Sequence, residues 1–349
     1  MKITALLATA LLVSTATTQA ADYCVDDVNA LQPILNLAGS NGEDDHIMLV
    51  QGFYDIPGGG LTYTSSDGGD LEISGGWQGI CLARSGDAFD TVLDGGSTDR
   101  ILSIVANGRS VTVDRLMFFN GSANLGAGLQ VLFALNLVVE RSAFVGNNGL
   151  RSALYASDGI NSARISNNLF TLNEGGQVAE LRQSGGEGLY FNNNTVVDNS
   201  AAKNASVELV ARDGASALVA NNILWHNTGH DLDLFRSTGD LFYWNNSVGS
   251  YRGPPVGVNN VSLDPLFEPG VFSYELSPGS PLIDAGTLPP DGSGSFESDW
   301  DVGVVDFAGD TRLQGGNVEM GAFEASDVLF ESGFGDFSST LWALTALDR

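Results

Sequence analysis

Several acidic and basic side chains in the second half of the chain could do chemistry on a sugar. They share short stretches in which charged residues alternate with apolar ones, so if the apolar neighbours point into a core, the carboxylates form an outward acidic strip. Two carboxylates that face one glycosidic bond can hydrolyse it, and carboxylates stacked about 5 Å apart raise one another's pKa or bind a cation. The carboxylates are Glu180, Glu208, Asp231 and Asp233, and the nearby arginines are Arg182 and Arg236. We take this strip as the candidate catalytic site, and a solvated strand face is the structural alternative.

Lyase chemistry on an acidic sugar needs a base beside the substrate carboxylate. After an export signal is removed, Lys203 is the one lysine of the chain, and Arg182, Arg212 and Arg236 are alternative bases. No lyase motif surrounds them. The three histidines are scattered, which gives no zinc site. Acidic glycine-rich turns allow weak calcium binding, and the sequence requires no cofactor.

Aromatic side chains are the second class of candidate binding residues, because their faces can stack on sugar rings. Tyr243 and Trp244 are consecutive, so on a strand only one of them can face outward, and Trp225 follows Leu224 in the same ambiguous way. We predict that Trp225, Tyr243 and Trp244 contribute to ligand binding if they reach the surface.

A repeat positions these residues. An apolar residue that opens each unit recurs in steps of 26, 26, 26, 28 and 24 residues. The residue five places later is also apolar in every unit. The opening positions are Val113, Val139, Ile165, Phe191, Val219 and Tyr243, and the second column is Phe118, Phe144, Phe170, Val196, Leu224 and Val248. Two or three short strands in each repeat predict a parallel β-helix, that is, a solenoid, and a sandwich or propeller is the alternative.

Asparagine forms further columns in the same units. One column holds Asn168, Asn194, Asn222 and Asn246, and a closing column holds Asn147, Asn173, Asn199 and Asn227, with Asn120 displaced by one place in the first unit. Identical amides one coil apart can hydrogen-bond in a ladder. Asparagine also tolerates left-handed backbone conformations, so we expect the closing column to make the bends.

The two ends of the repeat region need covers. Residues 28–38 place apolar side chains at helical spacing before Gly39, which predicts a cap helix. From about Gly249 the repeat is lost and proline becomes common, so we expect loops packed over the last coil. Cys24 and Cys81 are the two cysteines, and we predict that a disulfide between them ties the cap to an early coil.

The N-terminal residues and the net charge indicate the location of the protein and the classes of partner that it does not bind. Lys2, an apolar stretch and Thr18-Gln19-Ala20 are typical of a cleaved export signal, and no later stretch is apolar enough for a transmembrane segment. The net charge of −27 excludes nucleic acid as a partner. The same charge disfavours polyanionic sugars unless divalent cations bridge them.

Six segments outside the asparagine columns also carry a family resemblance. They are residues 71–77, 91–96, 264–267, 277–286, 306–312 and 319–324. Together with the Asn-Asn coils they resemble exported bacterial right-handed parallel β-helix repeat proteins, including the choice-of-anchor type, of the pectin-lyase-like superfold. This resemblance implies contact with polysaccharide and export, to the medium or to the outer surface of a Gram-negative cell.

These observations give one prediction for architecture and two for function. We expect a signal peptide at 1–20, an N-terminal cap at 21–46, β-helix coils at 47–248, C-terminal coils and capping loops at 249–325, and a tail at 326–349. The leading functional hypothesis is a secreted or cell-surface β-helix that binds polysaccharide or another surface glycan without catalysis. The alternative is a polysaccharide-degrading hydrolase or lyase that uses the acidic strip.

Overall fold

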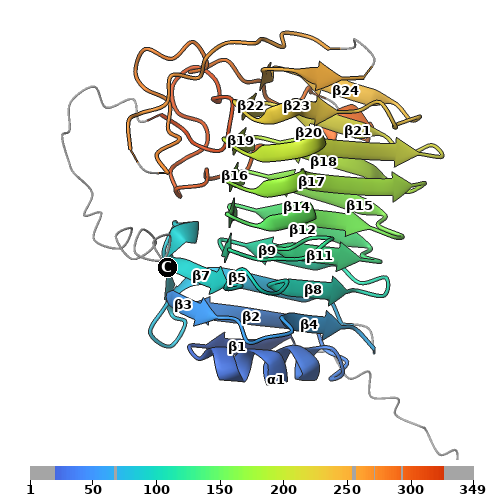
Figure 1. Cartoon of the computed structure of the whole chain (residues 1–349), viewed down its shortest axis with the longest axis vertical. Helices are drawn as coiled ribbons and strands as arrows, with labels where there is room; N and C mark the ends of the chain where they lie inside the picture. Colours follow the sequence, from blue (N-terminus) through green and yellow to red (C-terminus); the bar gives the residue numbers. More distant parts are fainter. Residues whose placement is uncertain (1–19, 67–68, 254–256, 271, 292–293, 326–349) are drawn as a thin grey trace, which may run out of the picture.

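A computed structural model describes residues 20–66, 69–253, 257–270, 272–291 and 294–325. These residues form a parallel β-solenoid of about nine turns, so the predicted all-β architecture is confirmed (Figure 1). The predicted signal peptide, apart from Ala20, and the predicted tail lie outside the described residues. Among the described helices, none is both long enough and apolar enough to cross a membrane.

Three sheets run along the solenoid, and we call them A, B and C. Sheet A contains β1 (Ala21–Val25), β2 (Asp45–Val50), β5 (Leu71–Gln78), β9 (Val111–Asp114), β12 (Asn136–Glu140), β15 (Ser162–Ser166), β18 (Gly188–Asn192), β21 (Ala217–Ala220) and β24 (Leu241–Trp244), with β6 (Ala83–Arg84) antiparallel to β5. Sheet B contains β3 (Gly52–Asp55), β7 (Thr91–Asp94), β10 (Met117–Phe119), β13 (Ala143–Val145), β16 (Leu169–Thr171), β19 (Thr195–Val197), β22 (Ile223–Trp225) and β25 (Ser247–Val248). Sheet C contains β4 (Leu61–Thr64), β8 (Leu102–Val105), β11 (Leu129–Leu132), β14 (Asn148–Ser157), β17 (Glu174–Ser184), β20 (Ser200–Arg212), β23 (Thr228–Asp233) and β26 (Tyr251–Arg252).

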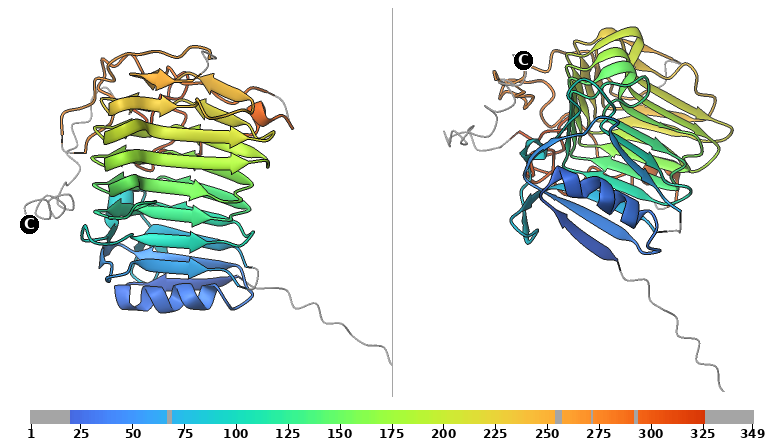
Figure 2. Two further views of the ribbon diagram at one scale, coloured as in Figure 1. Left: turned by 45° about the vertical axis from the view of Figure 1, so that its right-hand side comes forward. Right: turned by 60° about the horizontal axis from the view of Figure 1, so that its bottom comes forward.

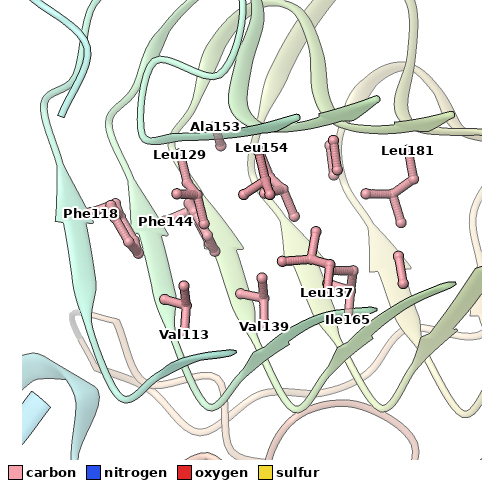
Figure 3. Close-up of a cluster of buried hydrophobic side chains, with 14 of the residues drawn as sticks. Val113, Phe118, Leu129, Leu137, Val139, Phe144, Ala153, Leu154, Ile165 and Leu181 are labelled. Atoms are coloured by element: carbon pink, nitrogen blue, oxygen red, sulfur yellow. The ribbon is translucent and has the colours of Figure 1, made fainter. Parts of the chain in front are cut away.

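The two apolar columns predicted from the repeat stack in register inside the solenoid. The opening column runs from Val113 to Tyr243 along sheet A, each member opposite the next, and it continues downward through Ile73 and Ile47. The second column lies on sheet B, where the rings of Phe118 and Phe144 are 4.9 Å apart (Figure 3). Both columns are buried, so one apolar core fills the length of the solenoid.

The predicted asparagine ladders are also present. Asn222 shows the pattern: its amide donates to Oδ1 of Asn246 at 2.8 Å, and its own Oδ1 accepts from the amide of Asn194 at 3.1 Å. The backbone N–H of Asn194 donates to the same oxygen, and Asn222 donates further to the carbonyl of Phe191. A polar group buried in a core is costly unless it is hydrogen-bonded, and here donors and acceptors are matched from coil to coil.

One part of the asparagine prediction is wrong, because the closing column does not supply the left-handed bends. In that column Asn147, Asn173, Asn199 and Asn227 form the ladder, while the preceding residue takes the positive φ angle, as His226 does at 56°. The displaced Asn120 has a φ of 52° and belongs to this preceding column. Left-handed bends also occur one residue before the other ladder, at Asn167, Asn193, Asn221 and Asn245, and at Arg115 and Arg141.

The N-terminal cover agrees with the prediction. Helix α1 (Val28–Ala38) begins at Asp27, whose carboxylate accepts the N–H of Asn29, and it lies across the first coil (Figures 1 and 2). The side-chain amide of Gln32 replaces the hydrogen bonds that a neighbouring strand would make. It donates to the carbonyl of Thr62 and accepts the N–H of Thr62, both at 2.8 Å. The Cys24–Cys81 disulfide is present and joins β1 to the turn after β5.

The C-terminal segment does not only cover the last coil, which corrects the expectation for residues after Gly249. Residues 257–261 begin a further coil, where Asn260 ends the ladder, and the chain then runs back along the outside of sheets A and B (Figure 1). The left-handed asparagines hold it: Asn167 donates to the carbonyl of Val302, and Asn221 exchanges two hydrogen bonds with Thr287. The outward edges of these bends are therefore docking positions for the chain's own backbone.

A buried arginine fixes the end of this segment. Arg312 is fully buried, donates to the carbonyls of Glu319 and Gly321, and pairs with Glu324 at 3.1 Å. Burial lowers the pKa of Arg312 to about 10 and raises the pKa of Asp306, which accepts the N–H of Glu324, to about 6. Two segments that carry the family resemblance, 306–312 and 319–324, thus serve to lock the C-terminal segment onto the coils.

The ladder makes a testable prediction. Asn222→Ala should lower the free energy of unfolding by about 2–4 kcal/mol, because it leaves the buried N–H of Asn194 and several amide partners unsatisfied. Asn136→Ala is the matched control, since the exposed amide of Asn136 makes one hydrogen bond of 3.3 Å to Ser110; its effect should stay within about 0.5 kcal/mol. Urea unfolding followed by circular dichroism measures both, and equal losses would contradict the ladder's role.

Candidate functional site

The predicted acidic strip is a single column of side chains on sheet C. Glu180 in β17 lies opposite Glu208 in β20, and Glu208 lies opposite Asp233 in β23, so the predicted neighbourhood of these three carboxylates is confirmed. The column continues in both directions with polar or aromatic residues. In order along the solenoid it holds Thr62, Ser103, Gln130, Tyr155, Glu180, Glu208, Asp233 and Arg252.

Strand alternation explains why the carboxylates face away from the core. Leu181, Leu209 and Leu232 are buried in the central apolar cluster, and each is a direct chain neighbour of one of the three carboxylates. Successive side chains on a strand point to opposite faces, so Glu180, Glu208 and Asp233 emerge on the outer face of sheet C.

The carboxylates point outward as predicted, but the alternative of a solvated strand face is wrong. Glu180, Glu208, Asp231 and Asp233 are all no more than 3% exposed. Guanidinium groups lie against the three carboxylates of the column and shield them. An isolated buried carboxylate is strongly disfavoured, so this burial depends on those arginines.

The arginines are shared unequally among the carboxylates. Glu180 is paired with both Arg151 and Arg182, one on each oxygen. Glu208 has Arg236 at 3.3 Å, Arg182 at 4.0 Å and a hydrogen bond of 2.6 Å from the amide of Gln177. Asp233 is paired with Arg252 at 2.9 Å. We call this set the charged column: Glu180, Glu208 and Asp233 with Arg151, Arg182, Arg236 and Arg252.

Burial and neighbouring charges shift the pKa values of these groups in opposite directions. Burial raises the pKa of Glu180, and Arg182 and Arg151 offset only part of that effect. Burial lowers the pKa of Arg182, but Glu180, Glu208 and Tyr155 together more than offset this effect, so the pKa of Arg182 is raised. Both Glu180 oxygens face guanidinium groups, an arrangement that suits a fixed ion pair better than a carboxylate that must attack or release a proton.

Asp231, the fourth predicted carboxylate, does not join the charged column. It accepts hydrogen bonds from the ladder residue Asn227 at 2.7 Å and from the N–H of Ser250 at 2.8 Å. Burial raises its pKa, and these hydrogen bonds oppose that rise. Asp231 therefore holds the bend before β23 against the last coil.

The three predicted aromatic binding residues lie on other sheets and are not brought to the charged column. Tyr243 is a core residue that borders a hollow of about 470 Å³ at the last coil. Trp244 packs beside Phe242 on the outer face of sheet A, and Trp225 packs on sheet B against the cluster containing Leu276. The C-terminal segment partly covers both tryptophans, so the site is not built from them.

Sequence reasoning missed several members of the site. Arg151 and Gln177 precede irregular stretches where the strand register shifts, so the repeat does not align them with their partners Glu180 and Glu208. Arg252 lies after Gly249, where the sequence repeat is lost, so the repeat could not align it with Asp233. Phe235 is 66% exposed with the guanidinium of Arg252 4.9 Å from its ring centre, and the alternation that placed Asp233 outward is the signal that could have found it.

No group of three or more histidine, cysteine or acidic residues suited to a metal ion occurs in the part of the chain that the structure describes. The predicted weak calcium binding by acidic glycine-rich turns stays a prediction.

Because comparisons with known proteins find no match, a function can be inferred only from the fold and from the geometry of the charged column. No family model, no curated protein and no solved structure matches the chain significantly.

The unequal exposure of the ion-pair partners predicts unequal mutational effects. Arg182→Met should lower the free energy of unfolding at pH 8 by about 2–3 kcal/mol, because Glu180 has no access to water, whereas the Arg182 side chain is 28% exposed. Glu180→Gln should cost less than about 1 kcal/mol, since the freed guanidinium groups can turn to solvent.

The loss of unfolding free energy in Arg182→Met should depend on pH. The pKa of Glu180 is already raised in the folded protein, so in Arg182→Met a proton should replace the lost cation as the pH falls, and the destabilisation should shrink between pH 8 and pH 5. Urea unfolding at both pH values tests this. Equal losses in Arg182→Met and Glu180→Gln, or a loss that does not change with pH, would contradict the assignment.

Proposed function

We propose that the protein is an exported or cell-surface β-helix that binds polysaccharide, or another glycan-bearing surface, along the charged column without catalysis. The observation that carries the proposal is the arrangement of sheet C. There, three carboxylates are held in register, one coil above the next, and partly exposed guanidinium groups cover them on a face that the rest of the described chain leaves uncovered.

The C-terminal segment separates sheet C from the other two. Its aromatic and apolar side chains pack on the outer faces of sheets A and B. Phe296 stacks on Tyr190 of sheet A with ring centres 4.5 Å apart, and Phe307 belongs to the buried cluster that contains Phe119 of sheet B. Its described hydrogen bonds to the coils also fall on the strands and bends of sheets A and B. Sheet C therefore has the outer face suited to a partner.

The chemistry of this face suits sugars. Each guanidinium carries five N–H donors, and a carboxylate uses at most some of them, so the remaining donors can reach hydroxyl or carboxylate oxygens of a glycan. Arg151 lies 5.6 Å from the ring centre of Tyr155, and Phe235 offers an exposed aromatic face beside Arg252. The four arginines cover carboxylates that repeat along the solenoid at about 4.8 Å per coil, which gives an extended ligand several contacts.

Export is supported by the disulfide and by the resemblance of the sequence to exported β-helix proteins. A disulfide is the natural state of a cysteine pair outside the cytoplasm, and Cys24 pairs with Cys81 here. The N-terminal residues that resemble an export signal are consistent with this location.

One observation favours the alternative, a polysaccharide hydrolase or lyase. The pKa of Glu180 is raised by burial, as in a general acid, and Glu208 is its neighbour. In that mechanism Arg182 would have to leave Glu180 for a proton to be transferred. The ion pairs on both oxygens of Glu180 make binding the better-supported function.

A panel of neutral and acidic polysaccharides tests the proposal, with and without calcium. We expect saturable binding with no release of reducing ends or unsaturated sugars. Replacing Arg236 by glutamine should weaken binding roughly tenfold through loss of a charge-assisted contact, whereas Arg109→Gln, which lies away from the column on the turn after β8, should not change it.

Product formation that Glu208→Gln abolishes would replace the binding proposal by the enzymatic one. Absence of binding to every polysaccharide in the panel would contradict the proposed function.

A further inference from the structure

The charged column is not uniform along the solenoid. At its lower end, between β14 and β17, two guanidinium groups share the single carboxylate of Glu180. At its upper end, between β23 and β26, Asp233 and Arg252 form a one-to-one pair. The column therefore has a positive end and a neutral end.

Arg151 is the source of the excess charge. Its contact with Glu180 is made through Nε, the nitrogen nearest its stem, and no other carboxylate of the described residues pairs with it. Its side chain is 28% exposed, and its guanidinium lies over Tyr155, the next residue down the column. The donors of Arg151 can thus face a ligand without breaking the pair with Glu180.

The charges around Glu180 agree with an excess of one positive charge at this end of the charged column. They come from Arg182, Arg151 and Glu208, and Glu208 is in turn held by Arg236 and by the amide of Gln177. Moving up the column, each remaining carboxylate has its own arginine. A second negative charge on a ligand would therefore lie beside ion pairs that carry no net charge, and it would gain little attraction there.

The charge of the whole chain limits the ligand further. At a net charge of −27, a polymer with a charge on every sugar would be repelled by the molecule as a whole, and one extra guanidinium cannot compensate along its length. A chain of neutral sugars would leave the excess charge of Arg151 unused.

Building on the proposed function, we infer that the preferred ligand is a largely neutral glycan with one acidic group, bound with that group at Arg151 and its neutral part along β17, β20 and β23. The acidic group can be a carboxylate, sulfate or phosphate, because a guanidinium forms paired hydrogen bonds with all of these. The column thereby sets the direction in which the glycan lies.

Matched sets of oligosaccharides test this inference. Each set contains a neutral chain, the same chain with one terminal uronate, and a chain of the same length made of uronates. Isothermal titration with the full-length mature protein should give the singly acidic member an affinity roughly tenfold above the neutral member and above the polyuronate. Equal or better binding of the neutral or polyuronate member would overturn the inference and leave the proposed function standing. Absence of binding in every set would overturn both.

Variants at Arg151 connect the preference to the residue. Arg151→Gln should abolish the preference, so that the singly acidic member binds no better than the neutral chain, and Arg151→Lys, which keeps the charge, should retain most of the preference. Glu180 keeps Arg182 in both variants, and the thermal unfolding midpoint checks that the fold is intact. An unchanged preference in Arg151→Gln would contradict the assignment, as would its loss in both variants.

Discussion

The parallel register between coils is the constraint on which the rest of the molecule depends. A coil of this solenoid pairs with the next through three short strands, and the buried amides of the asparagine ladders fix the same alignment through side chains. A slip of one residue would expose the apolar columns and leave buried amides without partners. Since register repeats every side chain at about 4.8 Å, it also turns isolated residues of the sequence into columns.

Each sheet uses its outer column differently. On sheets A and B, apolar outer side chains and the left-handed asparagines at the bends receive the C-terminal segment, which the buried cluster around Arg312 then locks in place. On sheet C the outer column is ionic. Its carboxylates are buried by arginines that remain partly exposed, so the surface offered to a partner is formed by guanidinium groups although the protein as a whole is strongly acidic.

Much of the coil region follows from the sequence because its contacts are periodic. The stacked residues Val113 to Tyr243, the asparagine ladders and the pairing of Glu180 with Glu208 could be predicted, since each needs only a repeat of known length. The cap helix was predictable for a similar reason, as its apolar spacing is local.

Non-periodic contacts could not be predicted in this way. The path of the C-terminal segment depends on long-range pairs such as Asn167 with Val302, which no local pattern encodes. The burial of Glu180 depends on Arg151, whose position is set by a register shift within β14 and β17. Alternation identified the direction of the carboxylate but could not show which side chain would cover it.

A cysteine pair placed across two coils tests the register most directly. Val105 in β8 lies opposite Leu132 in β11, and both are half-buried on the outer face of sheet C. In-register strands bring their Cα atoms to about 4.8 Å, which a disulfide can span, so Val105→Cys/Leu132→Cys should form a second disulfide on mild oxidation of the folded protein. The pair Val105→Cys/Gln130→Cys, displaced by two residues, should remain reduced. Efficient oxidation of the displaced pair, or free thiols in the opposed pair, would contradict the stacking on which this account of the molecule depends.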